Sequence, residues 1–359
     1  MKRTYRKNIF SGIIGLIIIL SVAIFSSPAQ AESLDSFDAV VHFPDSQANK
    51  ELSYFDIQLA PEQKENLTVT LVNKGEQPLT LKAAFNRAVT NSAGVIEYSG
   101  INKDTAITAP YNIEELVTLS DSEINLEPKQ TKDVTLAIAM PKDIFDGVLA
   151  GGVYFEALSD EKVEGNIKNI FSREIALLIH SNTTEVKPDI VVDTAKADQV
   201  NYRNVIEVGV ENKASTYVKN VTIDYRVLLD DKEVLSGKKE KLSLAPNTRM
   251  PFRIPFAGEE FDNGKYTVDI TVSTDEGKWS GSPTFTISKG EAENFNKNDV
   301  TVKKSGLDLP WSSIALVAVL LVLGIVILLM INKNKKLKKE LAKKRRKRKK
   351  RPTSAAKSN

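Results

Sequence analysis

The chain has 359 residues, a formal net charge of +3 and no cysteine. The lack of cysteine excludes disulfides, thiol catalysis and thiolate metal sites, and two histidines are too few for a histidine-rich metal site. The length allows about two ordinary domains besides terminal segments.

Residues 1–31 have the order of a secretory signal peptide. Four cationic side chains precede an apolar run from Ile9 to Phe25, and Ala29-Gln30-Ala31 has the small-x-small pattern that signal peptidase accepts. The alternative is a retained membrane helix, because the apolar run is long for a signal peptide. The helix-breaking Ser26-Ser27-Pro28, together with Ala29 and Ala31, favours cleavage after Ala31.

The C-terminal region predicts one transmembrane helix over residues 310–331. From Trp311 to Ile331 nothing is more polar than serine and glycine. At ~1.5 Å per residue this stretch spans about 30 Å, the hydrocarbon thickness of a bilayer. Trp311 lies where an interfacial aromatic residue is expected.

The tail, residues 332–359, contains fifteen Lys/Arg residues and one acid. Such a run alone would suggest nucleic-acid binding or nuclear targeting, but after an apolar span it indicates the cytoplasmic side. We therefore expect Lys333, Lys335, Arg345 and Arg346, together with Trp311, to set the membrane topology.

The charge is divided unequally between the exterior and the ends. The leader carries +4 and the tail +14, and subtracting both from +3 leaves −15 for residues 32–310. An acidic exterior argues against a nucleic-acid partner. We expect a single-pass protein of the cell membrane with its ectodomain outside and its C-terminus in the cytoplasm. An ectodomain without disulfides fits a Gram-positive bacterium.

The ectodomain pattern predicts an all-β fold. Apolar and polar residues alternate over Leu67–Val72, Val134–Ala139, Val221–Val227 and Tyr266–Val272, as in strands with one buried face. Short strands at regular spacing with polar turns predict β-sandwiches. The fold class is therefore two tandem immunoglobulin-like β-sandwiches plus one C-terminal transmembrane helix.

The two halves of the ectodomain have similar strand order. LTVTLVNKG (67–75) has a counterpart in IEVGVENKA (206–214), each ending in Asn-Lys where the chain turns. We expect the first sandwich over 32–187, a linker over 188–199, the second sandwich over 200–288 and a polar stalk over 289–309.

No arrangement predicts catalysis, a metal site or a cofactor. His42 and His180 are expected at strands or strand ends, and Gly151-Gly152 at a close turn of a sheet. Asp230-Asp231 predicts a hairpin turn with solvated carboxylates. Phosphate-binding loops, nucleophile elbows and calcium loops are absent from the sequence, so we predict that the protein is not an enzyme.

Specific segments resemble the WxL-interacting protein family of Gram-positive bacteria. They are Tyr54-Phe55-Asp56, the strand ending at Asn73, Ala88-Val89-Thr90-Asn91 with Gly94 and Tyr98, Phe145-Asp146-Gly147 and Gly151-Gly152-Val153. Residues about 200–288 resemble the family's second domain, and the apolar span and basic tail complete its layout.

The resemblance implies a noncatalytic scaffold that is anchored in the membrane. It implies a first domain that binds peptidoglycan, a second that binds host surface components, and association with WxL-domain proteins. The polar or aromatic candidates for ligand contact are Tyr54, Asp56, Asn86, Thr90, Asn91 and Tyr98; the alternative roles for these side chains are turn capping and strand-face packing.

Two other classes of function remain as alternatives. One is an adhesin whose main ligand is a host protein, bound by residues 200–288. The other is a wall hydrolase, which would need a pair of carboxylates facing each other in a cleft.

Overall fold

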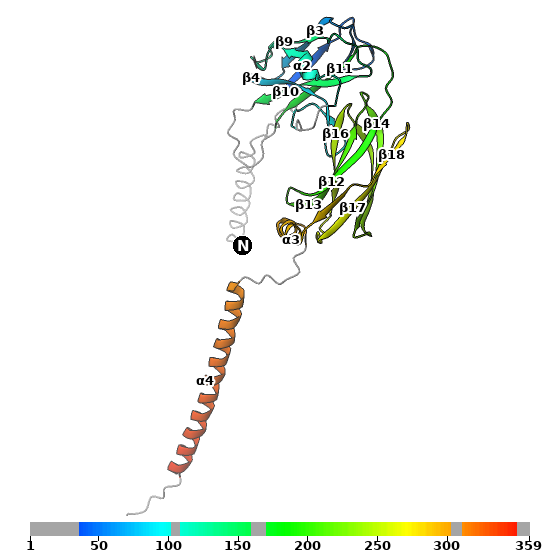
Figure 1. Cartoon of the computed structure of the whole chain (residues 1–359). Coiled ribbons are helices and arrows are strands. Elements are labelled where there is room, and N and C mark those ends of the chain that lie inside the picture. Colours follow the sequence, from blue (N-terminus) through cyan, green and yellow to red (C-terminus); the bar gives the residue numbers. More distant parts are fainter. Residues whose placement is uncertain (1–35, 102–107, 159–169, 303–310, 350–359) are drawn as a thin grey trace, which may run out of the picture. The chain divides into compact units, whose positions relative to one another are not determined.

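A computed structural model describes residues 36–101, 108–158, 170–302 and 311–349 (Figure 1). The chain divides into two units, residues 1–302 and 303–359, and each is described by itself. Within the described residues the first unit consists of two β-sandwiches with separate apolar cores. The predicted signal peptide, with Ala29 and Ala31, lies outside the described residues.

The first sandwich packs a four-stranded sheet against a five-stranded sheet. The four-stranded sheet has the order β1-β3-β9-β7, with β1 Phe37–His42, β3 Lys64–Asn73, β9 Thr131–Ala139 and β7 Val117–Leu119. The five-stranded sheet has the order β2-β11-β10-β4-β8, with β2 Phe55–Gln58, β11 Ser172–His180, β10 Leu149–Leu158, β4 Leu79–Arg87 and β8 Glu123–Leu126. All strand pairs in these sheets are antiparallel except β2 with β11.

The core of this sandwich consists of apolar side chains at every second position of the strands. Leu67, Val69 and Leu71 of β3 are buried, whereas Asn66, which points to the opposite face of the sheet, is exposed. A fully buried side chain of this size stabilises the fold by about 1.5–3 kcal/mol. The short helix α2, Ile113–Leu116, contributes the buried Ile113 to the same core.

The second sandwich has a three-stranded and a five-stranded sheet. The first has the order β12-β13-β16, with β12 Ile190–Val200, β13 Arg203–Asn212 and β16 Thr248–Pro255. The second has the order β15-β14-β17-β18, with β19 also paired to β17; the bounds are β15 Lys232–Leu244, β14 Val218–Leu229, β17 Gly264–Ser273, β18 Lys278–Gly281 and β19 Thr284–Ile287. The hairpin predicted at Asp230-Asp231 is confirmed, since Leu229 pairs with Lys232 and both aspartates have positive φ.

The prediction of a linker over residues 188–199 is wrong. Residues 190–200 form β12, which pairs with β13 along almost its whole length and has a register shift between Val192 and Ala195. Only one face of this edge strand packs on the core, and its outward residues are charged or polar. The polar face and the preceding Pro188 give the segment the composition of a linker.

The prediction of a stalk over residues 289–309 is wrong for its first part. Residues Lys289–Asn298 form helix α3, which packs on the second sandwich through the buried Ala292 and a ring contact of 5.5 Å between Phe295 and Phe261. Gln199 Nε2 of β12 donates to Phe295 O at 2.9 Å. The S-x-x-E spacing of Ser288 and Glu291 is the local signal for this helix start.

Replacing Ser288 by alanine is expected to remove the cap of α3 and to raise the pKa of Glu291. Ser288 N–H donates to Glu291 Oε2 at 2.8 Å, and Glu291 N–H donates to Ser288 Oγ at 3.3 Å. The hydrogen bonds from the backbone and then the side chain of Ser288 hold the pKa of Glu291 below its usual 4.5. Because this pKa is lowered on folding, its contribution to stability is present above pH ~4.5 and is lost as the pH falls through the folded value.

Carboxyl NMR titration of the intact protein and of Ser288→Ala measures this shift. The pKa of Glu291 should lie below 4.5 in the parent protein and move toward 4.5 in the variant. The carboxyl group of Asp269 in β17, whose pKa is lowered by Arg226 and Ser282, is the internal control and should titrate identically in both proteins. Because the backbone N–H of residue 288 remains in the variant, only part of the shift should be lost, and an unchanged titration of Glu291 would show that the Ser288 hydroxyl contributes nothing to it.

The second unit contains helix α4, Trp311–Lys349. It is the one helix among the described residues that is long and apolar enough to cross a membrane. Its 39 residues reach about 58 Å at 1.5 Å per residue, so the helix continues beyond the apolar stretch into the basic segment. The prediction of two immunoglobulin-like sandwiches plus one C-terminal apolar helix is confirmed.

Candidate functional site: the seam between the sandwiches

The two sandwiches meet in a contact region that we call the seam. It consists of residues 87–98, 109–113 and 145–150 of the first sandwich and residues 213–217 and 242–253 of the second. The hairpin of β5 Val89–Thr90 and β6 Ile96–Glu97 is its central part. Asn91 Oδ1 accepts from the N–H groups of Ala93 and Val95, at 3.0 and 3.1 Å, and so shapes the hairpin turn.

The hairpin forms hydrogen bonds with both sheets of the second sandwich. Gly94 O accepts from Ser243 N–H at 2.8 Å, and Thr90 Oγ1 accepts from Ala245 N–H at 2.8 Å. Thr90 Oγ1 also lies 3.3 Å from Thr248 Oγ1, at the start of β16. The backbone N–H groups of Ser243 and Ala245 at this end of the second sandwich therefore have their acceptors in the first sandwich.

A second set of contacts between the two sandwiches, which we call the second crossing of the seam, lies just after Phe145 in the chain. Val148 N–H donates to Ser215 O at 2.8 Å. Gly147 approaches the same residue so closely that a Cβ atom would lie 2.1 Å from Ser215 O, and its φ is +78°. His180 Nδ1 lies 3.0 Å from Gly147 O, and His180 Nε2 lies 3.0 Å from Asp56 Oδ1. Both contacts are hydrogen bonds only when the ring carries two protons, because both partners are acceptors.

A pair of tyrosines closes a third crossing. The hydroxyl oxygens of Tyr98 and Tyr217 are 3.2 Å apart. Asn86 Nδ2 donates to Tyr98 O at 2.7 Å, and a Cβ on Gly152 would meet the Tyr98 ring at 2.7 Å. Burial raises the pKa of Tyr98 and raises that of Tyr217 well above its usual value, so both phenols stay protonated at neutral pH.

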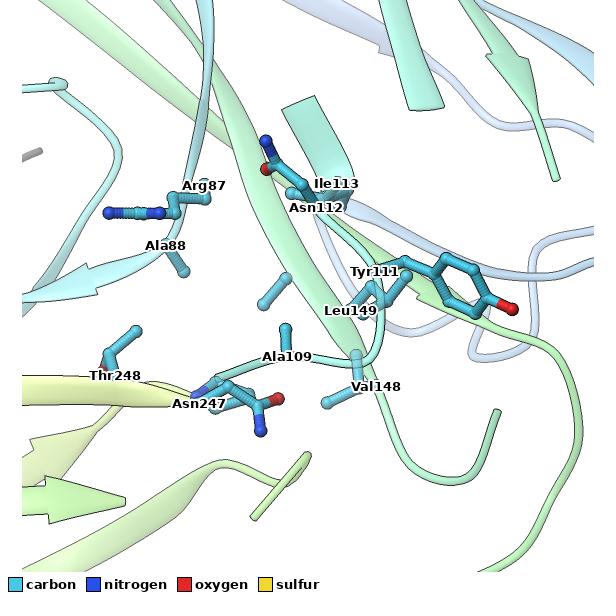
Figure 2. Close-up of a pocket in the computed structure, with 12 residues that line it drawn as sticks. Arg87, Ala88, Ala109, Tyr111, Asn112, Ile113, Val148, Leu149, Asn247 and Thr248 are labelled. Carbon is cyan, nitrogen blue, oxygen red and sulfur yellow. The ribbon is translucent and has the colours of Figure 1, made fainter. Parts of the chain in front are cut away.

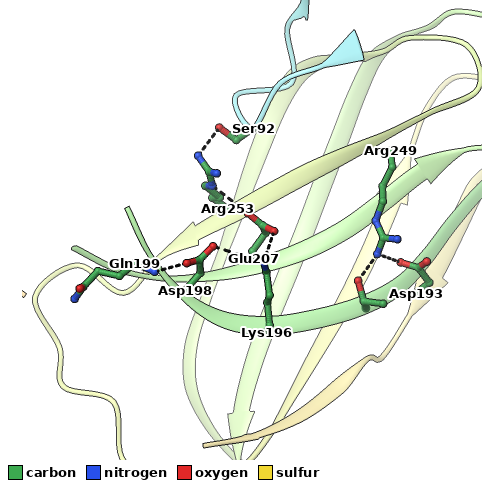
Figure 3. A network of polar contacts seen from close by, with 9 residues as sticks. Ser92, Asp193, Lys196, Asp198, Gln199, Glu207, Arg249 and Arg253 are labelled. Carbon is green, nitrogen blue, oxygen red and sulfur yellow. Dashed lines mark hydrogen bonds and ion pairs between the residues drawn. The ribbon is translucent and has the colours of Figure 1, made fainter. Parts of the chain in front are cut away.

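Polar contacts continue from the hairpin over the outer face of the three-stranded sheet (Figure 3). Arg253 Nη1 donates to Ser92 Oγ at 3.3 Å, and Arg253 Nε lies 3.3 Å from Glu207 Oε2. Lys196 Nζ lies 3.2 Å from the other oxygen of Glu207. Arg249 pairs with Asp193 at 2.6 Å. These charges are paired within the protein, so this face offers little unpaired charge to a ligand.

A hollow opens at the seam (Figure 2). Its empty volume is about 330 Å³, part of which is open to solvent. In Figure 2 the small side chains of Ala88, Ala109 and Val148 lie in its middle, with larger and polar side chains around them. The lining residues are Arg87, Ala88, Ala109, Tyr111, Asn112, Ile113, Val148, Leu149, Ala150, Pro246, Asn247 and Thr248.

Replacing Thr90 by valine is expected to lower the free energy of unfolding by about 1–3 kcal/mol, because the buried Ala245 N–H then has no acceptor. Valine keeps the shape of threonine, so the change removes the hydroxyl and little else. Hydrogen exchange should become faster at Ala245. Thr118→Val on the exposed face of β7 is the matched control and should change neither quantity measurably. Unchanged exchange at Ala245 would refute the contact.

The structure places the six predicted ligand-contact residues in and near the seam. Asn86 and Thr90 are each 1 % exposed, and Asn86 Nδ2 and Thr90 Oγ1 form hydrogen bonds within the protein, so the structure gives these two predicted ligand contacts structural roles instead. Asn91 shapes the hairpin turn, and Tyr98 pairs with Tyr217. Asp56 pairs with His180, and burial, with the carboxylate of Asp56 as the second cause, raises the pKa of the half-buried Tyr54.

Other predicted positions are also located. His42 and His180 end β1 and β11, as predicted. Gly151 and Gly152 do not form a turn but lie inside β10, where the rings of Phe85 and Tyr98 cover them. Trp311, Lys333, Lys335, Arg345 and Arg346 all lie on α4. Among the residues that the structure describes, no cluster of three or more His, Cys, Asp or Glu side chains could hold a metal ion.

Sequence analysis missed the second sandwich's side of the seam. Ser215, Tyr217, Ala245 and Thr248 follow or precede strands in polar turns, and nothing local marks them. Thr90 and Ala245 are 155 positions apart, so their contact leaves no short-range pattern. The signal that could have pointed here is general: loops at the ends of sandwiches carry their contacts.

Two joined sandwiches with one helix that is long and apolar enough to cross a membrane define a class of β-sandwich proteins with a candidate membrane anchor. The chain matches the model described as "WxL Interacting Protein, peptidoglycan binding domain" over residues 37–157 and the model described as "WxL Interacting Protein, host binding domain" over residues 162–297. The chain therefore belongs to the WxL interacting protein family. The second model includes β12 and most of α3; it also includes β11, which the structure pairs with β10 and β2 of the first sandwich.

Solved structures with a similar arrangement of strands include fimbrial chaperones. The chaperone DraB of E. coli is 13% identical over 64% of this chain and 92% of its own, with a TM-score of 0.27. The CupB2 chaperone of Pseudomonas aeruginosa is 13% identical over 64% and 96%, with a TM-score of 0.25. The class 5 fimbriae chaperone CfaA is 12% identical over 68% and 99%, with a TM-score of 0.27. No curated protein matches the chain in sequence.

Proposed function

We propose that the protein is a noncatalytic scaffold of the Gram-positive cell surface. In this proposal residues 37–157 bind peptidoglycan, and the chain tethers WxL-domain proteins near the membrane. The observation that carries it is the match to two adjacent binding-domain models on one chain that also has an apolar helix. Stiff sandwiches suit this work, because they hold loops and strand edges in fixed positions.

The proposed topology places both sandwiches outside and the basic tail inside. Cationic segments next to a membrane span stay on the cytoplasmic side, and the tail carries fifteen Lys/Arg residues. The same topology requires residues 1–31 to direct export, and in this proposal they act as a signal peptide cleaved after Ala31. Because the chain has no cysteine, single cysteines report sidedness cleanly.

A membrane-impermeant maleimide tests the topology in intact cells. Ser236→Cys in the second sandwich is expected to label in intact cells, whereas Ala342→Cys in α4 is expected to label only after permeabilisation. Both positions are accessible, so a lack of labelling reports the membrane and not burial. Labelling of Ala342→Cys in intact cells would refute the orientation.

The binding function is tested with the full chain in detergent micelles or nanodiscs. The protein is expected to sediment with purified sacculi and to retain a WxL-domain protein encoded beside it in a pull-down. The same preparation without sacculi, and an unrelated single-pass protein with sacculi, are the controls. Failure of both assays would refute the scaffold.

An adhesin is the second candidate, and the description of the second family model favours it. In this case residues 162–297 bind a host surface or matrix component. Immobilised host matrix proteins should then retain the full chain independently of sacculi. If they retain none of it while sacculi do, the scaffold remains and the adhesin is refuted.

A further inference from the structure

The hollow at the seam has a floor of small apolar groups. The side chains of Ala88, Ala109, Val148 and Ala150 contribute mainly methyl groups, and its innermost part has room for a group about the size of one water molecule or one methyl group. A bulky ring or a branched chain does not fit there. A ligand would enter with a single small apolar group.

Two amides stand at the hollow with unused hydrogen-bonding capacity. Asn247 Nδ2 donates to Lys213 O at 3.0 Å, and its Oδ1 accepts from Ser215 Oγ at 3.0 Å. Asn112 Nδ2 has one contact with Glu115, at 3.3 Å, and its Oδ1 accepts from Glu114 N–H. Each amide has two N–H donors and two acceptor lone pairs, so each keeps one donor and one lone pair beyond its contacts among the described residues.

The charge around the hollow favours an uncharged ligand. Residues 32–310 carry a net charge of −15, which disfavours an anion. Glu114 Oε1 accepts from the backbone N–H of Arg87 at 3.1 Å, so a carboxylate lies beside the one cationic residue that lines the hollow. The chemistry that remains is a methyl group attached to, or next to, an amide.

We propose that this hollow binds a methyl-bearing acyl amide, with the methyl group on the alanine floor and the amide between Asn112 and Asn247. The acetamido group of an amino sugar and an alanyl residue of a peptide both have this chemistry. This inference rests on the proposed binding to the wall, and it assigns that ligand to the seam where both sandwiches contribute residues. In this proposal the acyl amide binds in the hollow and not on the open face of a sheet.

Filling the hollow tests the proposal in the full chain. Ala109 lines the hollow and is half-buried at the edge of the first core, so Ala109→Leu places bulk in the hollow at a position that is partly open to solvent. The matched control is Ala84→Leu on the exposed face of β4 of the same sandwich. Thermal unfolding midpoints of both variants, compared with the parent protein, establish that they fold.

The probes are a trimer of N-acetylglucosamine, the deacetylated glucosamine trimer in high salt that screens its positive charge, and a diacetyl-lysyl-D-alanyl-D-alanine amide, which has no carboxylate. Saturation-transfer NMR is expected to mark the methyl groups of the acetylated sugar or of the peptide, and the two arms distinguish these sources. The affinity should fall roughly tenfold or more in Ala109→Leu and stay unchanged in Ala84→Leu. The deacetylated sugar should not bind.

Three results would overturn the proposal: no binding of either acylated probe, equal binding to Ala109→Leu and the parent, or equal binding of the deacetylated sugar. Sedimentation with sacculi separates this failure from failure of the proposed function. If the parent still sediments, wall binding stands and the hollow is not its site. If the parent does not sediment, the proposed function itself is refuted.

Discussion

Replacing Asn73 by alanine is expected to destabilise the first sandwich by about 2–4 kcal/mol, because several backbone groups lose their partner at once. Asn73 is 1 % exposed, and its Nδ2 lies 2.8 to 3.2 Å from the carbonyl oxygens of Gln77, Leu126 and Glu127. Its Oδ1 accepts from Gly75 N–H at 2.9 Å. One side chain thus joins the turn after β3 to the turn after β8.

Asn212 occupies the same position in the second sandwich. It is fully buried, donates to Thr216 O and Ala245 O, and accepts from Ala214 N–H. Because Ala245 also donates to Thr90 across the seam, Asn212→Ala should additionally speed hydrogen exchange in the hairpin of β5 and β6. Asn73→Ala should leave exchange in the second sandwich unchanged.

Chemical denaturation and hydrogen exchange of the full chain measure both effects. Asn66→Ala is the matched control, because Asn66 lies on the same strand β3 with its side chain exposed. It should change the free energy of unfolding by about 0.5 kcal/mol or less. If Asn73→Ala behaved like this control, the side-chain contacts of Asn73 would contribute nothing measurable.

These two asparagines also show how far sequence reasoning reaches. The Asn-Lys pair at the end of each strand predicts a similar turn in both halves, and the structure gives both asparagines the same contacts with following backbone. The alternation that predicts the strands works because each sandwich has one buried face per strand. Local pattern and tertiary burial agree there.

Prediction of secondary structure from the sequence fails where one face of a strand or helix is polar, or where its contacts are with residues far away in the chain. The segment that forms β12 has Asp193, Lys196 and Asp198 on its outer side, so its composition resembles a linker although most of its residues pair with β13. Helix α3 contacts the second sandwich through a narrow stripe of side chains, and most of its residues are polar. Tertiary contacts, which no local window contains, decide both elements.

The position of the candidate site was partly predictable from the sequence, but the roles of its residues were not. Segments 88–98 and 145–147 stood out through the family resemblance, and both lie at the seam. Their role as ligand contacts did not follow, because Thr90 and Asn86 turn inward and satisfy buried backbone groups. A polar residue in a loop is equally suited to bind a ligand or a neighbouring domain, and only the fold decides.

A seam of this kind makes the two sandwiches one mechanical unit. Three crossings contain backbone or buried side-chain hydrogen bonds, and a buried donor that loses its acceptor costs about 1–3 kcal/mol. A load on a ligand held by one sandwich is therefore passed to the other through fixed contacts. The seam matters for a scaffold because it fixes the relative positions of binding surfaces on both sandwiches.

Replacing Gly147 by alanine is expected to open one of these crossings and to lower the free energy of unfolding by about 2–4 kcal/mol. The φ of +78° is strained for alanine, and the added Cβ would lie 2.1 Å from Ser215 O. The loop has to move away from Ser215, which removes the hydrogen bond from Val148 N–H. Faster hydrogen exchange at Val148 is the direct measurement.

Gly290→Ala provides the matched control for this substitution. Gly290 lies within α3, and a Cβ there meets nothing within 4 Å, so alanine should be neutral or stabilising by about 0.4–1 kcal/mol. The same chemical change thus has opposite expected signs at two glycines of one unit. If Gly147→Ala were as stable as the parent and kept Val148 protected, the close approach of Gly147 to Ser215 would not hold the sandwiches together. The contacts at Thr90 and at the paired tyrosines would then be the ones that hold the two sandwiches together.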